Sequence, residues 1–174
     1  MGSALRRSTG RAIDTVYGST EHALEGLETA IRTRETALGN FLTDVLRQRL
    51  GAQIGFINGG AVRINDDIPA GGRITEYELE GIFYFDNKPA GFELTGQELY
   101  DLLAKSISQP DLGHGRFLQV SGLRFRYHVH GQGFDRTYSM TPDDVEIGTL
   151  EAGFLPLDLE ARYTAASLDY IWEN

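Results

Sequence analysis

The residues best placed to do chemistry lie in the run Ile54-Gly55-Phe56-Ile57-Asn58-Gly59-Gly60-Ala61-Val62-Arg63. An apolar strand leads straight into Asn58 and two glycines, and a single arginine follows. Glycines let the backbone come close to a ligand, and open sheets commonly bind ligands where their strands end. Asn58 and Arg63 are therefore candidate binding residues. A plain hairpin turn with a solvated arginine remains the alternative, because Asn-Gly is also the commonest hairpin pair.

Two further arginines, Arg32 and Arg34, precede a predicted helix. The planar guanidinium group suits phosphate or carboxylate through paired donors. Each of these arginines also fits the ordinary role of a solvated surface charge.

Three aromatic residues, Phe83, Tyr84 and Phe85, stand directly before Asp86 and Asn87. Alternation along an extended segment predicts that two of the rings are buried and one is exposed. An exposed ring beside an asparagine amide can stack on a flat heterocycle and bond to its edge, as in proteins that bind unpaired bases. Burial of all three rings in the core is the alternative.

A metal centre or a catalytic nucleophile finds little support in the sequence. His128 and His130 share one face of a predicted strand, but the remaining histidines, His22 and His114, lack ligand-like spacing. We therefore interpret the pair as solvated residues on a hairpin edge. Cysteine is absent, which excludes disulfides, thiolate catalysis and sulfur-ligated zinc. Nucleophile-elbow and phosphate-loop motifs are also absent.

Local patterns predict the elements that must position these residues. Apolar positions spaced by three and four residues predict a helix over 35–50, ended by Gly51 and followed by a strand over 53–57. Capping boxes at Thr75 and Thr95 predict two further helices. The remaining predicted elements are strands at 15–17, 90–94, 117–129 with a bend at 121–122, 137–140 and 163–166, and a terminal helix capped by Ser167. The pattern favours an α+β fold, a mixed sheet with packed helices.

The composition limits the partners of this domain. The chain has 174 residues, 41% hydrophobic residues and a formal net charge of -9. This length fits one domain, and the acidic balance argues against a nucleic-acid partner, because phosphate backbones need a basic face. Converging arginines can still reverse the local field for a small anion. No apolar run is long enough to span a membrane.

Seven motifs stand in an order and spacing that resemble the C-terminal domain of 5′-nucleotidases. The resemblance covers roughly residues 15–174, with residues 1–14 as a lead-in. In order, the motifs are Arg32-x-Arg34-Glu35-Thr36-x-Leu38-Gly39-Asn40, Asn58-Gly59-Gly60-Ala61-Val62-Arg63, Gly72-Arg73-Ile74-Thr75, Phe85-x-Asn87, Leu94-Thr95-Gly96-x-x-Leu99, Phe117-Leu118-Gln119-Val120-Ser121-Gly122 and Tyr163-Thr164-Ala165-Ala166.

The resemblance implies a substrate-binding role for this domain. In that family it binds the nucleoside part of a nucleotide, while an N-terminal metallophosphatase domain holds two divalent metal ions and performs the hydrolysis. The base lies between two aromatic rings, matched here by Phe85 and Tyr170. Base, ribose or phosphate contacts are implied for Arg32, Asn58, Arg63 and Asn87, with the backbone of Gly60 close to the ligand. If the resemblance holds, the rings of Phe85 and Tyr170 face each other across a gap for one base.

Departures from the family pattern shape the remaining expectations. Tyr84 stands where the family usually has proline, and the chain stops at Asn174 just before the usual Gly-Gly-Asp segment. We therefore expect a domain truncated at its C-terminal end. The metallophosphatase motifs are absent, so we expect the isolated chain to be inactive and to need no cofactor itself. Family members imply a periplasmic, cell-surface or extracellular location. A non-catalytic nucleotide-binding module and a structural or oligomerisation module remain the alternative functions.

Overall fold

The computed structural model describes residues 15–109 and 113–173. Its largest sheet has the strand order β4-β11-β2-β5, in which β11 is parallel to β2 and antiparallel to β4, and β2 is antiparallel to β5. The sheet is therefore mixed, as the sequence predicts. These strands are β2 (Ile54–Asn58), β4 (Pro89–Thr95), β5 (Leu118–Ser121) and β11 (Arg162–Leu168).

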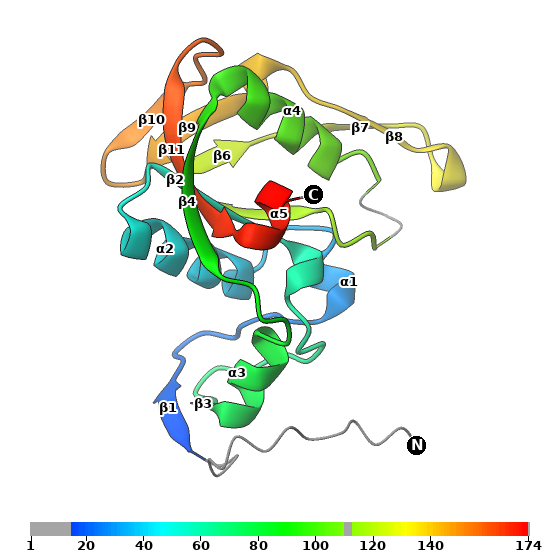
Figure 1. Ribbon diagram of the computed structural model, residues 1–174. Helices are drawn as coiled ribbons and strands as arrows, with labels where there is room; N and C mark the ends of the chain where they lie inside the picture. The colour runs from blue at the N-terminus through cyan, green and yellow to red at the C-terminus, as the bar shows by residue number, and fades with distance from the viewer. Residues whose placement is uncertain (1–14, 110–112, 174) are drawn as a thin grey trace.

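Helices cover both faces of this sheet, with α2 on one side and α4 on the other (Figure 1). The helices are α1 (Glu28–Ile31), α2 (Ala37–Leu50), α3 (Glu76–Ile82), α4 (Gly96–Ser106) and α5 (Asp169–Glu173). Thr36 caps α2, and Gly51 ends it in the left-handed conformation with φ 63°. Both predicted capping boxes are present, at the starts of α3 and α4.

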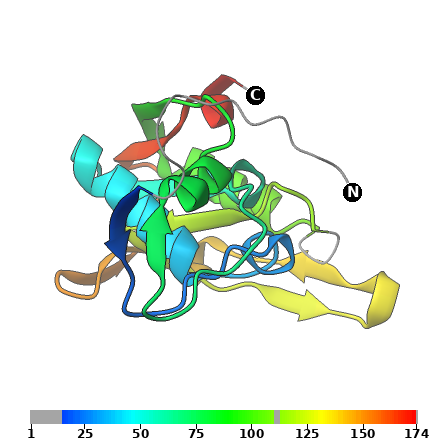
Figure 2. The same ribbon diagram turned by 90° about the horizontal axis from the view of Figure 1, so that it is seen from below.

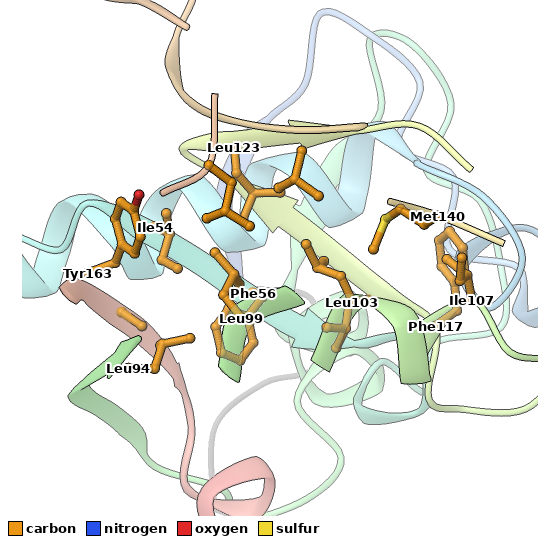
Figure 3. Close-up of a cluster of buried hydrophobic side chains, with 14 residues drawn as sticks. Ile54, Phe56, Leu94, Leu99, Leu103, Ile107, Phe117, Leu123, Met140 and Tyr163 are labelled. Atoms are coloured by element: carbon orange, nitrogen blue, oxygen red, sulfur yellow. The ribbon is translucent and has the colours of Figure 1, made fainter. Parts of the chain in front are cut away.

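Alternation along β2 divides the buried side chains into two cores. Ile54 and Phe56 pack with Leu99 and Leu103 of α4 (Figure 3), whereas Ile57 packs against α2. A Cβ on Gly55 would lie 2.7 Å from the carbonyl oxygen of Thr43, so its lack of a side chain lets α2 lie close to the sheet.

The first core is closed by a second sheet of strand order β10-β9-β6, all antiparallel. Its strands are β6 (Leu123–Phe125), β9 (Val145–Thr149) and β10 (Gly153–Pro156). The sequence analysis predicted no strand between residues 140 and 163, so the structure adds the β9–β10 hairpin to the predicted elements.

Two small antiparallel pairs lie outside these sheets. They are β1 (Val16–Ser19) with β3 (Arg73–Thr75), and β7 (His128–His130) with β8 (Thr137–Ser139). The β7–β8 hairpin projects away from the rest of the molecule (Figure 2).

The predicted cap at Ser167 is wrong. This residue belongs to β11, whose pairing with β4 runs through Leu168. The Ser167 hydroxyl donates a 2.7 Å hydrogen bond to the carbonyl oxygen of Phe56 on the neighbouring strand instead. Sheet pairing therefore outweighs the local capping preference.

Candidate functional site

A cavity of about 670 Å³ opens beside the exit of β2. Its volume lies within the range of ordinary small-molecule sites. Every residue to which the resemblance assigns a binding role lines it: Arg32, Asn58, Gly60, Arg63, Phe85, Asn87 and Tyr170. These residues come from segments far apart in the chain, and the fold brings them together.

Two walls of the cavity meet where Gly60 and Gly115 approach each other closely. After β2 the chain turns through a short 3-10 helix, Gly59–Ala61, and does not form a hairpin. The Gly60 N–H donates to the Gly115 carbonyl oxygen at 2.9 Å. A Cβ on Gly60 would lie 2.9 Å from the Gly115 Cα, and one on Gly115 would lie 2.8 Å from the Gly60 Cα. Any side chain at either position would push the two walls apart.

Asn58 presents a buried acceptor at this point. Its Nδ2 donates to the Gly115 carbonyl oxygen at 3.0 Å. Its Oδ1 is buried and makes no hydrogen bond in the structure. Buried polar atoms without a partner are uncommon and costly in folded proteins. An acceptor without a partner therefore lies within a residue of the cavity wall, beneath its accessible surface.

Arg32 lies at the end of α1, with a side chain only 16% exposed. Its Nη2 donates to Glu28 Oε1 at 2.6 Å, and its Nη1 donates to the Gly113 carbonyl oxygen at 3.3 Å. Its Nε is buried without a hydrogen-bond partner. The wall therefore holds an unpaired donor as well as the unpaired acceptor of Asn58.

Glu28 also contacts the second arginine of the cavity. Arg63 Nη1 lies 3.4 Å from Glu28 Oε1, and its guanidinium carbon lies 5.8 Å from the centre of the Phe85 ring. The Glu28 N–H donates to Asn65 Oδ1 at 3.0 Å, and Asn65 is held in the left-handed region at φ 46°. The segment after Arg63 thus anchors the start of α1, which carries Glu28 and leads to Arg32.

The loop between α1 and α2 is held by Gln119 of β5, which is 1% exposed. Its Nε2 donates to the carbonyl oxygens of Ile31 at 2.9 Å and Arg34 at 2.7 Å, and its Oε1 accepts from the Thr36 N–H at 3.0 Å. A Cβ on Gly39 would lie 2.0 Å from Gln119 Oε1. One buried amide therefore fixes the backbone on both sides of Arg32.

The predicted burial of two rings among Phe83, Tyr84 and Phe85 is wrong, because all three are exposed, at 57%, 72% and 46%. They follow α3 in a segment without strand alternation, so the period-two pattern does not apply. Phe85 packs edge-on against Tyr84, with ring centres 5.3 Å apart. It also lies next to Arg63 and lines the cavity.

Asp169 links the segment that contains Asn87 to the segment that contains Tyr170. The side chain of Tyr170 is 51% exposed. The Asp169 N–H donates to the Lys88 carbonyl oxygen at 2.9 Å, and its Oδ1 accepts from the Lys88 N–H at 3.1 Å. The same oxygen accepts from the Tyr170 N–H at 2.9 Å. These bonds explain how a residue of α5 reaches the same cavity as the segment after α3.

The cavity also contains residues that the sequence analysis missed. They are the apolar Leu102, Leu118 and Ile171 and the polar Lys105, Ser106, His114 and Arg116. No carboxylate is among the described lining residues. A chain with a net charge of -9 thus gathers Arg32, Arg63, Lys105 and Arg116 around one hollow. This arrangement suits an anionic ligand with an apolar or aromatic part.

The other candidate residues lie elsewhere. Arg34 does not line the cavity and pairs with Glu25 at 2.6 Å. Its hydrogen bond lowers the pKa of the Glu25 carboxyl group. In the β7–β8 region, His128 lies 3.4 Å from Asp144, and His130 lies 2.8 Å from the Ser139 hydroxyl.

The described part of the chain lacks two features that would point to other functions. Residues 15–109 and 113–173 contain no group of three or more His, Cys, Asp and Glu side chains arranged to hold a metal ion. Within the same ranges, no helix is long and apolar enough to cross a membrane.

Similar proteins share this domain. The trifunctional nucleotide phosphoesterase protein YfkN of Bacillus subtilis (strain 168) is 28% identical over 158 residues, which are 88% of this chain and 10% of that protein. The 5′-nucleotidase of Vibrio cholerae serotype O1 is 29% identical over 140 residues, 80% of this chain and 22% of that protein. The chain therefore spans less than a quarter of the length of either curated relative.

Solved structures agree on the fold. The 5′-nucleotidase precursor of Thermus thermophilus is 33% identical, with a TM-score of 0.77, over 90% of this chain and 30% of that one. The Haemophilus influenzae NAD nucleotidase is 17% identical, with a TM-score of 0.72, over 93% of this chain and 29% of that one, and at this identity it shows the fold alone.

The family model described as "5'-nucleotidase, C-terminal domain" matches residues 16–174. The chain therefore belongs to the 5′-nucleotidase C-terminal domain family.

Proposed function

We propose that this chain is the nucleotide-recognition domain of a 5′-nucleotidase-type metallophosphoesterase. The observation that carries the proposal is the convergence of Arg32, Asn58, Arg63, Phe85 and Tyr170 on one cavity. It combines guanidinium groups, an unpaired amide oxygen and aromatic rings, which are the groups that a nucleotide needs for its phosphate, base edge and base face. The names of the relatives, a nucleotide phosphoesterase and a 5′-nucleotidase, support the same substrate class.

In this proposal the base stacks between Phe85 and Tyr170. A ring on each face of a base contributes on the order of 1–3 kcal/mol per stack and tolerates any base. Phe85 is 46% exposed and Tyr170 is 51% exposed, so both have surface to offer to a ligand. Asn58 and Asn87 then read the base edge, and the buried Asn58 Oδ1 gains a partner on binding.

The chemistry of hydrolysis belongs to another domain in this proposal. The described residues offer no metal-binding group, so the two divalent ions would be held by a metallophosphatase domain outside this chain. That domain is also the proposed partner of this one. By the same family argument, we propose a periplasmic, cell-surface or extracellular location.

The test is a titration of the chain with adenosine and with uridine, monitored by ligand-observed NMR. We expect saturable binding weaker than about a micromolar dissociation constant, since an open half-site makes few contacts to offset the entropy of immobilisation. Phe85→Ala should weaken binding about five- to 150-fold, the loss of one stack of about 1–3 kcal/mol. Phe134→Ala, which removes a fully exposed ring on the β7–β8 hairpin, should leave the affinity unchanged. An unchanged affinity in Phe85→Ala would refute the base-stacking assignment.

A second measurement tests the division of labour. We expect no release of phosphate from AMP by the chain with added Mg²⁺ or Mn²⁺. Metal-dependent release that is lost in His128→Ala/His130→Ala would place catalysis within this chain and overturn the proposal.

A further inference from the structure

The end of β11 is the place where two segments of the cavity are joined. β11 pairs with β4 as far as Leu168 and Pro89, and the chain then turns into α5 (Figure 1). One main-chain bond follows, from the Asp169 N–H to the Lys88 carbonyl oxygen at 2.9 Å. The Lys88 N–H, in contrast, donates to the side-chain oxygen Oδ1 of Asp169, at 3.1 Å. The Asp169 carboxylate therefore takes the place that a main-chain carbonyl group would hold in a longer antiparallel pair.

The same side-chain oxygen also serves the first turn of α5. Asp169 Oδ1 accepts from the Tyr170 N–H at 2.9 Å. The first N–H groups of a helix have no partner within the helix, so this bond fixes the direction in which α5 begins. Asp169 is half-buried and is not among the described residues that line the cavity. It therefore acts on the cavity only through its neighbours.

The segment that carries Phe85 depends on such a link. The segment starts at the end of α3, where the Phe83 N–H donates to the Leu79 carbonyl oxygen at 2.8 Å, and residues 83–86 are exposed. Exposed segments have few contacts that fix their position. Asp169 holds the far end of this segment through Lys88, three residues after Phe85. A displaced Asp169 side chain would therefore loosen both this segment and the start of α5.

We propose that Asp169 is a positioning residue that holds Phe85, Asn87 and Tyr170 in the arrangement that binds a base. The inference rests on the proposed function and adds a residue that does not touch the ligand. The property that matters is an acceptor oxygen at the position of Oδ1. An amide oxygen can accept from the same two backbone N–H groups, so the negative charge is not required.

The experiment measures the affinity of four variants for adenosine and uridine, which carry no charge. Asp169→Asn keeps the acceptor oxygen and should bind both nucleosides within about twofold of the parent. Asp169→Ala removes the oxygen, and Asp169→Glu keeps the charge but moves the carboxylate outward by one methylene group. Both should weaken binding at least about fivefold, the smaller loss expected for one stack. The matched control is Asp158→Ala, which removes an exposed carboxylate that accepts from the Glu160 N–H at 3.0 Å outside the cavity, and it should keep the parent affinity.

Two further measurements separate positioning from a general loss of structure. Amide hydrogen exchange at Lys88 and Tyr170 should become faster together in Asp169→Ala and Asp169→Glu, and stay unchanged in Asp169→Asn. In Asp169→Ala/Tyr170→Ala, the loss of nucleoside affinity should be smaller than the product of the two single losses, because Asp169 acts in part through Tyr170.

The outcomes distinguish this inference from the proposed function. If the parent binds nucleosides and Asp169→Ala binds equally well, the role of Asp169 is refuted and the proposed function stands. An Asp169→Asn protein as weak as Asp169→Ala would also refute it, because the charge would then be the cause. Losses that multiply fully in the double variant would mean that Asp169 acts independently of Tyr170, which contradicts the inference. If the parent binds no nucleoside, the proposed function falls and the role of Asp169 falls with it.

Discussion

Replacing Gln119 by leucine is the most demanding test of how the site is built. Leucine keeps the apolar volume but removes the amide, which leaves the Thr36 N–H and the carbonyl oxygens of Ile31 and Arg34 without their hydrogen-bond partner. A buried polar group that loses its partner costs about 1–3 kcal/mol. Two of these groups belong to the buried residues Ile31 and Thr36, which predicts a loss of at least about 2 kcal/mol in the free energy of unfolding.

Urea denaturation followed by circular dichroism measures this loss. With a slope of about 2 kcal/mol per molar urea, the midpoint should fall by about 1 M. Gln119→Glu keeps the acceptor for Thr36 but cannot donate to the two carbonyl oxygens, so it should also be strongly destabilised.

Gln48→Leu is the matched control. Gln48 is exposed on α2, and a surface substitution of this kind changes stability by no more than about 0.5 kcal/mol. A Gln119→Leu protein within about 1 kcal/mol of the parent would refute the reasoning, because the loop around Arg32 would then be held by other contacts.

Three further changes follow from the same structure. Gly39→Ala should destabilise the protein despite the better helix propensity of alanine, because its Cβ would lie 2.0 Å from Gln119 Oε1. In a double-mutant cycle measured by urea denaturation, Gly39→Ala combined with Gln119→Ala should lose less stability than the sum of the two single changes. The hydrogen bonds that Glu98 accepts from the backbone and side chain of Thr95 lower its pKa. Glu98→Gln should therefore reduce stability near pH 7, and the difference should vanish as the pH falls through the lowered pKa, whereas Glu80→Gln, at an exposed glutamate outside a capping box, should show no such trend. Gly55→Ala should raise the unfolding rate and cost about 1–3 kcal/mol in urea denaturation, since its Cβ would meet α2 at 2.7 Å; unchanged stability would mean that the helix can shift.

Local signals predicted the elements of this fold well. The capping boxes at Thr75 and Thr95 and the stop at Gly51 depend on a few neighbouring residues, and all are present. The prediction at Ser167 failed because pairing of β11 with β4, more than seventy residues away along the chain, decides the conformation there. Capping preference is a local property, and sheet pairing is not.

The cavity could be predicted only in part. The sequence motifs predicted Asn58 and Arg63 as binding residues, because their local sequence is unusual. Nothing in their neighbours marks Lys105 and Arg116, because surface cations look alike until the fold shows which of them converge. Gln119 stood inside a recognised motif, but its role depends on contacts with residues 83 to 88 positions away.

The place of β11 in the sheet also bears on how the protein is synthesised. This strand lies between β4 and β2, yet of the four strands of the main sheet it is the last to be synthesised. Until residues 162–168 emerge, β4 lacks its neighbour in the main sheet, and β2 is paired on one side only. Unpaired strand edges invite association with other chains. The main sheet of the nascent domain therefore stays incomplete until β11 emerges. Molecules that shield unpaired strand edges during translation should raise the yield of folded protein.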